Sequence, residues 1–209
     1  MVETGQVKII ELPTETSLIN YLGVADFLAS KWFWMQLEPA EHMLLFQSDS
    51  ILCANSGRQV EDFFEYDFVG APHPFFPGAF NGGLSLRNVS LSRQVVDTWN
   101  IADDVDSGTG LGLYDDLWFW DKMKDLGGRF PTGEKASEFA VDFIWAEKPL
   151  GFHGLGKGPQ KERAEEIYAW CPEALLAIGE VLELSEDEKK ARPTLEDAET
   201  TGGGLLPFG

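Results

Sequence analysis

The chain has 209 residues, and its 16 basic and 35 acidic side chains give a formal net charge of −19. A nucleic-acid-binding protein needs basic side chains to replace phosphate counterions, so this charge excludes that class and disfavours docking on anionic lipid. Hydrophobic residues make up 44% of the chain, enough for a folded core. Because the first residues do not form a secretory signal and no apolar run is long enough to cross a bilayer, we expect no membrane span and a cytoplasmic location by default.

Strand and helix patterns alternate along the chain and predict an α/β fold. The first half predicts a strand at 7–12, one or two helices over 17–37, a strand at 43–47, its extension or a return strand at 51–54, a short helix at 61–65, a strand at 66–70, an irregular stretch at 71–83 and a strand at 84–87. The continuous apolar run at 43–47 suits a strand buried on both faces of a parallel or mixed sheet.

The second half predicts a helix at 88–99, a loop at 103–112, a helix at 113–126, a helix-to-strand passage at 136–145, a Gly- and Pro-rich loop at 149–159 and helices at 163–170 and 173–184. Residues 1–184 thus read as one α/β domain, and 185–209 as an acidic, Gly-rich disordered tail. The two cysteines, Cys53 and Cys171, leave a disulfide open, but we expect buried free thiols.

Two candidate ligand-binding segments follow predicted strands or lead into one. Asp49 comes directly after an apolar strand, where α/β sheets gather ligand groups, and its carboxylate suits a divalent metal. The alternative is a turn-forming Asp that caps its own backbone. Asn81, Gly82 and Gly83 present amides suited to a sugar or phosphate, or else form the tight turn typical of Asn-Gly.

Two further candidates are acids beside aromatic residues and a loop histidine. Asp115 and Asp116 precede Trp118, so burial against aromatic rings favours a general base and a sugar-stacking face. The alternative is a helix N-terminus, where acids are favourable, above a core aromatic face. His153 lies in a Gly-rich loop and is either a metal ligand or an ordinary hydrogen-bonded histidine. His73, between two prolines, reads as structural.

Five strings in order carry a resemblance: L-L-F-Q-S-D-S-I-L-C-A-N-S, V-E-D-F-F-E-Y-D-F-V-G-A-P, F-N-G-G-L-S-L-R, Y-D-D-L-W-F and P-L-G-F-H. Together they resemble a largely uncharacterised family of fungal glycosyltransferase-like proteins, a domain-of-unknown-function family, over roughly residues 7–155. The resemblance implies a GT-A-like, Rossmann-like mixed sheet flanked by helices. It also implies upstream sequence for the first strands, so we expect an N-terminally short version of that fold.

The resemblance assigns a role to each candidate. Asp49 stands where the fold has its metal-binding D-x-D motif, with Ser48 and Ser50 in the neighbouring positions, and His153 matches the late histidine that completes a Mn²⁺ or Mg²⁺ site. Asn81, Gly82 and Gly83 match the glycine-rich segment beside donor and acceptor, and with Trp118 and Ser50 they are the expected substrate contacts. Asp115 and Asp116 match an E-D pair whose second acid acts as base, although the first acid here is the shorter Asp.

The leading hypothesis is a metal-dependent glycosyltransferase that moves a sugar from a nucleotide-sugar donor, foremost a UDP-sugar, to a carbohydrate or other hydroxyl acceptor. A catalytically reduced pseudoenzyme, or a carbohydrate- or protein-binding domain, uses the seven Trp residues equally well. A metal-dependent hydrolase fits the acids and His153 by residue type but lacks an H-E-x-x-H or paired-histidine signature. The acid excess repels a diphosphate unless a cation lies between them, so the charge favours metal dependence.

Overall fold

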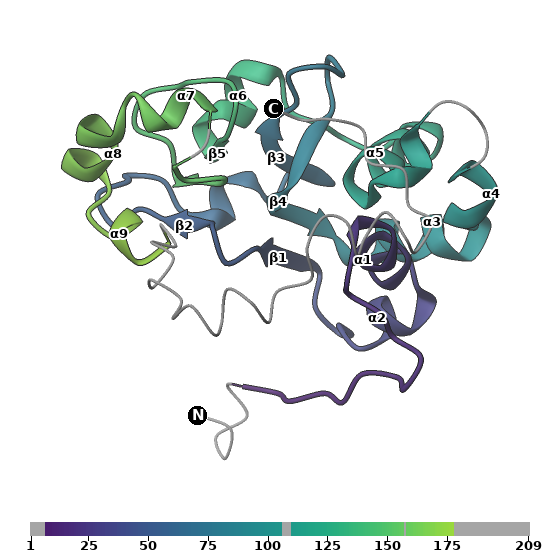
Figure 1. Cartoon of the computed structure of the whole chain (residues 1–209). Helices are drawn as coiled ribbons and strands as arrows, with labels where there is room; N and C mark the ends of the chain where they lie inside the picture. The colour runs from purple at the N-terminus through teal and green to yellow at the C-terminus, as the bar shows by residue number, and fades with distance from the viewer. Residues whose placement is uncertain (1–6, 106–109, 157, 178–209) are drawn as a thin grey trace. The chain divides into compact units, whose positions relative to one another are not determined.

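The computed structural model describes residues 7–105, 110–156 and 158–177, and it has an α/β fold (Figure 1). The chain divides into two compact units, Met1–Ile178 and Gly179–Gly209, and everything below concerns the first. The predicted tail at 185–209 and the second half of the predicted helix at 173–184 lie outside the described residues.

The elements alternate between helices and short strands. In chain order they are α1 (Tyr21–Leu28), α2 (Lys31–Met35), β1 (His42–Phe46), β2 (Ile51–Leu52), the 3₁₀ helix η1 (Val60–Phe63), β3 (Phe68–Pro72), β4 (Phe80–Asn88), α3 (Val89–Thr98), α4 (Ile101–Val105), the 3₁₀ helix η2 (Leu111–Leu113), α5 (Asp115–Asp125), α6 (Gly133–Phe139), β5 (Ala140–Val141), β6 (Gly151–Phe152), α7 (Gly158–Lys161), α8 (Ala164–Trp170) and α9 (Ala174–Ala177).

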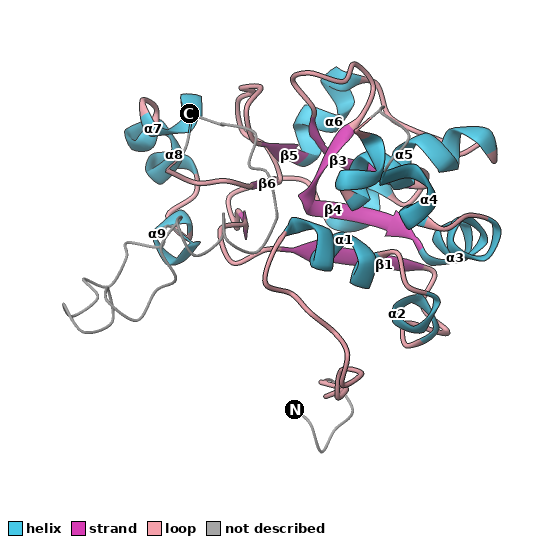
Figure 2. Cartoon of the chain, turned by 45° about the vertical axis from the view of Figure 1, so that its right-hand side comes forward, coloured by secondary structure: helices cyan, strands magenta, loops and turns pink. Residues whose placement is uncertain are grey.

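The first sheet is antiparallel, with β4 between β1 and β3 (Figure 2). Its pairing with β1 is continuous, whereas its pairing with β3 jumps from Gly70↔Ser85 to Ala71↔Asn81. Residues 82–84 of β4 therefore bulge out of the register with β3. A bulge redirects the backbone groups of a strand, and this one turns the two glycines of β4 towards the candidate site.

The second sheet has the order β2-β6-β5, with β2 and β6 antiparallel and β5 and β6 parallel. One core cluster surrounds the first sheet and contains Trp34, Phe68, Trp118 and Phe139, and a second cluster lies at the small sheet. Figure 1 shows the helices α1–α5 on one side of the first sheet and α7–α9 beside the second sheet. The candidate site lies where β4 approaches both groups.

Local hydrogen bonds explain where several helices begin. The side chains of Asn20, Ser30, Asn88 and Thr132 accept hydrogen bonds from the backbone N–H groups of Gly23, Phe33, Leu91 and Lys135, at the starts of α1, α2, α3 and α6. These caps satisfy donors that the first helical turn leaves unpaired. The prediction of one or two helices over 17–37 is confirmed as the two helices α1 and α2.

Several sequence predictions about strands are wrong in part. Residues 7–12 form no strand, and Ile9 is 77% exposed because no neighbouring strand pairs with this segment among the described residues. The strand predicted at 43–47 exists as β1, but it is an edge strand of an antiparallel sheet with Phe46 67% exposed. β4 starts at Phe80, inside the stretch predicted as irregular, since its glycines are accommodated by the bulge.

Two predicted loops also contain regular structure. The segment predicted as a loop at 103–112 holds the end of α4 and the 3₁₀ helix η2, while 106–109 lie outside the described residues. The Gly- and Pro-rich stretch at 149–159 includes β6 and the start of α7. Both elements are very short, so their sequences carry little periodicity.

The two cysteines form a disulfide, which corrects the prediction of free thiols. Cys53 follows β2, Cys171 follows α8, and the bond joins them across 118 residues of sequence. They meet because α8 and α9 pack on the small sheet in the second core cluster. Asn55 strengthens the same junction by donating a hydrogen bond to the Trp170 carbonyl at 2.8 Å.

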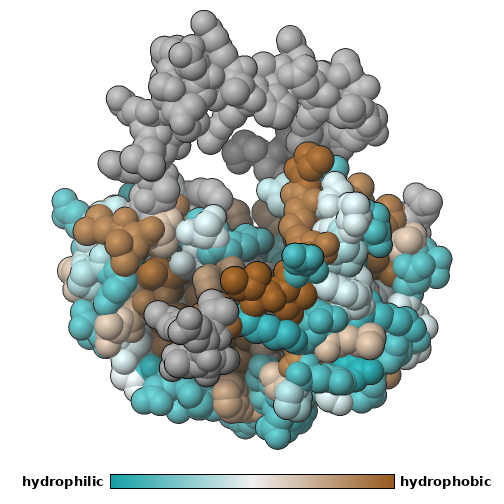
Figure 3. Space-filling model, turned by 90° about the horizontal axis from the view of Figure 1, so that it is seen from below, coloured by the Kyte–Doolittle hydropathy of each residue, from teal (hydrophilic) through white to brown (hydrophobic). Residues whose placement is uncertain are grey.

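Figure 3 shows groups of hydrophobic residues among hydrophilic ones on the face it presents. The exposed large hydrophobic residues near the N-terminus are Val7, Ile9, Leu12, Leu18, Ile19, Tyr21 and Leu22.

Within the described ranges, every helix is too short or too polar to cross a membrane.

Candidate functional site

The bulge in β4 brings two groups of candidate residues together through adjacent glycines. The Gly82 N–H donates a hydrogen bond to Asp116 Oδ2 at 2.7 Å. The next residue, Gly83, lies directly against the imidazole of His153, so that a Cβ atom there would overlap the ring. Asp116 of α5 and His153, which follows β6, therefore contact two consecutive residues of β4, Gly82 and Gly83.

The first half of the site surrounds His153. Its Nδ1 lies 3.3 Å from Asp142 Oδ2, while its Nε2 lies 3.1 Å from Gln47 Oε1 and 3.6 Å from Asp49 Oδ1. When Nδ1–H donates to Asp142, the Nε2 lone pair faces the oxygens of Gln47 and Asp49. A carboxylate behind a histidine in this way is the usual arrangement for a metal-binding imidazole, because it sets the tautomer and ring orientation.

These residues fit a divalent cation. Two donors of one ion, each about 2.1 Å from it, lie roughly 3.0–3.5 Å apart, close to the spacing of the Gln47 and Asp49 oxygens from His153 Nε2. No cluster of three or more His, Cys, Asp or Glu side chains in the described part of the chain forms a complete metal site. Mg²⁺ and similar cations are commonly held by one or two carboxylates together with substrate phosphates, and the Asp49 carboxylate suits that mode, with the His153 imidazole as an additional nitrogen donor.

The backbone around His153 is held from the second sheet and from α7. The buried side chain of Gln160 donates to the carbonyls of His153 at 2.6 Å and of Asp142 at 3.0 Å. The His153 N–H donates to the Val141 carbonyl at 2.9 Å. The imidazole and its carboxylate partner consequently sit on a rigid frame, as a binding site requires.

The second half of the site is the first turn of α5. The two oxygens of Asp116 accept the N–H groups of Gly82 and Leu117, at 2.7 and 2.8 Å. Burial, and after it the charge of the neighbouring Asp115, raise the pKa of the Asp116 carboxyl to about 6, against the lowering effects of Arg87 and the two N–H donors. A carboxyl with a pKa near neutrality is suited to exchange a proton with a substrate.

Asp115 does not share that position, because it pairs with Arg87 instead. Arg87 Nη2 lies 2.8 Å from Asp115 Oδ2, and the arginine side chain has no exposed area. The two adjacent acids that the sequence placed together thus differ in their surroundings. Asp115 is held by a cation, and Asp116 is held by backbone N–H groups.

The remaining predicted substrate contacts, Ser50, Asn81 and Trp118, are engaged in hydrogen bonds within the protein. The Ser50 hydroxyl donates to the Gly83 carbonyl at 2.9 Å and braces the bulge, and Asn81 Oδ1 accepts the Gly83 N–H at 2.8 Å within the same turn. Trp118 is fully buried, and its indole N–H donates to Asp104 at 2.8 Å. It has no exposed ring face for a sugar, because its position on α5 points into the core.

Sequence reasoning missed four residues of the site: Gln47, Arg87, Asp142 and Gln160. Asp142 follows the short apolar strand β5, the same signal that identified Asp49, so it was open to prediction. The other three have no local signal, since their roles depend on contacts with distant segments. His73 fits its structural reading: its Nδ1 accepts the N–H groups of Phe75 and Phe76, each at 3.2 Å.

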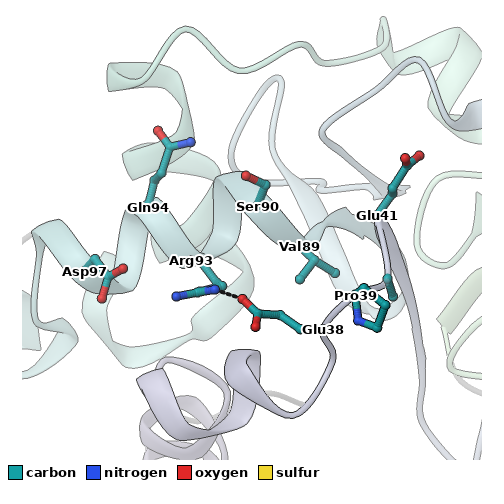
Figure 4. A pocket seen from close by; sticks show the side chains of 9 residues that line it. Glu38, Pro39, Glu41, Val89, Ser90, Arg93, Gln94 and Asp97 are labelled. Carbon is teal, nitrogen blue, oxygen red and sulfur yellow. Dashed lines mark ion pairs between the residues drawn. The ribbon is translucent and has the colours of Figure 1, made fainter.

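A separate surface hollow of about 560 Å³ lies between α3 and the segment leading into β1 (Figure 4). Arg93 and Glu38 point towards one another there and form an ion pair. None of the candidate residues lines this hollow, and its other acids include Glu41 and Asp97. It is thus a feature distinct from the site at the β4 bulge.

Comparison with known proteins places these residues in one family. The model of a family described as "Protein of unknown function (DUF5672)" matches residues 6–153, which is most of the chain and extends to His153. A search of curated proteins gave no match.

Proposed function

Because the chain belongs to the DUF5672 family, whose description assigns no activity, we propose a function from its own residues: metal-dependent transfer of a sugar from a nucleotide-sugar donor to a hydroxyl acceptor. One observation carries the proposal: His153, with its neighbouring carboxylates, and the acid Asp116 lie against the adjacent residues Gly83 and Gly82. A GT-A-like fold is part of the same proposal, supported by the mixed α/β architecture.

In this proposal Asp49 and His153 hold Mn²⁺ or Mg²⁺, with Gln47 beside them and Asp142 orienting the imidazole. A bound divalent cation supplies positive charge that neutralises a diphosphate and stabilises it as a leaving group. The preference for a UDP-sugar donor comes from the resemblance described above. The acid-rich site suits such a donor only with a cation in place, since carboxylates alone repel phosphate.

Asp116 acts as the general base. Its ionised carboxyl takes the proton of the acceptor hydroxyl while the hydroxyl oxygen forms a bond to the anomeric carbon, and the bond from that carbon to the nucleoside diphosphate breaks. The N–H groups of Gly82 and Leu117 hold the carboxyl in one orientation, and the absence of a side chain at Gly82 lets Asp116 lie directly against β4. Asn81 and Ser50 contribute by holding the bulge in shape.

Calorimetric titration of UDP-sugars with and without Mn²⁺ tests the cation half. We expect binding that depends on Mn²⁺ in the natural protein and is lost in Asp49→Ala, while Asp125→Ala, an exposed acid at the far end of α5, binds normally. Absence of metal-dependent binding to any UDP-sugar in the natural protein would overturn the proposal.

Release of UDP in the presence of acceptors tests the base. We expect Asp116→Asn to bind donor and Mn²⁺ as before but to lose turnover, while Asp125→Asn keeps it. Donor binding without any Asp116-dependent turnover would identify a carbohydrate- or nucleotide-binding protein instead of an enzyme.

A further inference from the structure

Arg87 has no part in the transfer proposed above, although its guanidinium lies within the base half of the site. It stands on β4 with no exposed side-chain area, 4.7 Å from the Phe68 ring centroid and 5.3 Å from that of Phe119. Burial of an arginine carries a large desolvation cost, of which stacking on aromatic rings recovers only a part. Its position therefore calls for a role in addition to packing.

The contacts of Arg87 point to the acid pair. Nη2 lies 2.8 Å from Asp115 Oδ2, and Nε donates to Ser85 Oγ at 3.3 Å. A Cβ atom on Gly82 would lie 2.6 Å from Nη2 and 2.8 Å from Asp116 Cβ. The guanidinium and the Asp116 side chain thus converge on one glycine, and a larger residue there would separate them.

Starting from the proposed role of Asp116 as base, we propose that Arg87 is a positioning residue that holds the Asp115 carboxylate in an ion pair, so that Asp116 is the one carboxyl of the pair that exchanges a proton with the acceptor. Two adjacent, partly buried carboxyls otherwise share a proton between them, and their titration belongs to the pair. The ion pair of Arg87 with Asp115 has no net charge, so Asp116 is the carboxyl of the pair that has no cation as its partner.

The charges around Asp116 agree with this division. Asp115 raises the pKa of Asp116 and Arg87 lowers it, after burial as the largest effect. The other charged or titratable groups on the surrounding elements are Asp26 and Tyr21 of α1, Arg93 and Asp97 of α3, Asp103 and Asp104 of α4, Tyr114, Asp121, Lys122, Lys124 and Asp125 beside or on α5, and Asp49, Asp142 and His153 across the glycine pair. Lys122 pairs with Asp104 at 3.1 Å and Asp97 pairs with Lys31 at 3.1 Å, so these groups are compensated elsewhere.

We expect the carboxyl pKa values to shift in opposite directions in two variants. In Arg87→Met the carboxyls lose their cation, so the first proton binds to the pair at a higher pH than it binds to Asp116 in the natural protein. In Asp115→Asn the positive charge of Arg87 acts on Asp116 alone, so the pKa of Asp116 falls. A neighbouring charge shifts a carboxyl pKa by about one to three units, so both changes are measurable. The double variant leaves Asp116 without either neighbour, and its pKa returns towards the natural value.

The experiment follows carboxyl protonation by ¹³C NMR of protein labelled at Asp, without any substrate. Arg93→Met, the same substitution at the half-exposed ion pair with Glu38, is the control and should leave the Asp116 signal unchanged. If Arg87→Met does not fold, Arg87→Lys and Asp115→Asn decide, because Lys retains the charge and should hold the pKa near its natural value.

The outcomes separate this inference from the proposed function. A higher pKa in Arg87→Met together with a lower pKa of Asp116 in Asp115→Asn supports the positioning role. Changes of the same sign in both variants, or no change in Asp115→Asn, overturn it. An arginine with only a structural role would change the stability of the protein and leave the pKa of Asp116 as it is. Failure of the natural protein to transfer any sugar overturns the proposed function. The NMR result is obtained without substrate, so it still decides whether Arg87 controls the titration of the acid pair.

Discussion

A methyl group added at Gly83 tests the geometry on which the whole site depends. The backbone of Gly83 lies outside the left-handed region, so alanine suffers no conformational strain there. The methyl group would instead overlap three atoms of the His153 ring. We therefore expect Gly83→Ala to push the imidazole away from Gln47 and Asp142.

The expected magnitude follows from the contacts that would be lost. Overpacking of a tight site costs about 1–3 kcal/mol, and each hydrogen bond lost by the displaced ring about 1 kcal/mol. The free energy of unfolding should thus fall by about 2–4 kcal/mol. In a His153→Ala background the ring is absent, so adding Gly83→Ala should change stability by less than about 0.5 kcal/mol. The coupling energy of this double-mutant cycle is therefore itself about 2–4 kcal/mol.

Urea denaturation of the four proteins gives the cycle, and Mn²⁺ titration of Gly83→Ala should show affinity at least tenfold weaker, on the order found for displaced partners of metal ligands. Gly57→Ala serves as the control, because its Cβ would meet no atom within 4 Å, and its stability should stay within about 0.5 kcal/mol. Equal destabilisation by Gly83→Ala with and without the His153 ring would refute the reasoning.

Further predictions concern the disulfide, the base and a buried acid. Replacing Cys53 and Cys171 by Ser should lower the free energy of unfolding by about 5 kcal/mol in urea denaturation, since the bond closes a loop of 118 residues; an unchanged midpoint would contradict this. Turnover should rise with pH through about 6 as Asp116 ionises, and Asp116→Asn should lower it about 10²–10⁴-fold in a UDP-release assay. Because the folded-state pKa of Asp116 lies above its ordinary value, its ionisation opposes folding, so the stability it contributes at low pH should be lost between about pH 4 and 6 in the natural protein and not in Asp116→Asn. Asp67→Ala should destabilise by about 2 kcal/mol in urea, with Mn²⁺ affinity unchanged, because it leaves the backbone N–H of Arg129 and the side-chain amide of Asn88 unpaired.

The helices were the predictable part of the fold, because their signals are local. The apolar spacing and the capping residues Asn20, Ser30 and Asn88 identify α1, α2 and α3 without knowledge of their neighbours. The strands were harder. The apolar run of β1 resembles a doubly buried strand, but its burial depends on which strands lie beside it, and that is decided by segments distant in sequence.

The site shows the same division. Asp49, Gly82, Gly83, Asp116 and His153 were predicted from residue type and strand or loop context, and the structure brings them together at the β4 bulge. The resemblance to a family supplied the role expected of each.

The residues that complete the site were not predictable in this way. Arg87 looks like an ordinary residue of a strand, and only the pairing of β4 with α5 sets it beside Asp115. Trp118 was misjudged for the same reason, because the sequence does not say which side of α5 faces the core. The cysteine pair likewise became visible only through the packing of α8 and α9 on the second sheet.

The bulge in β4 also constrains how the chain tolerates changes in length. Side chains on a strand alternate between its two faces, so deletion or insertion of one residue between Gly82 and Arg87 would move Arg87 to the opposite face of the sheet. Its charge would then enter the apolar contacts now made by Leu84 and Leu86, while Asp115 would lose its partner. The five-residue step from Gly82 to Arg87 should therefore be invariant in length among relatives that share this acid pair, even where the residues between them differ.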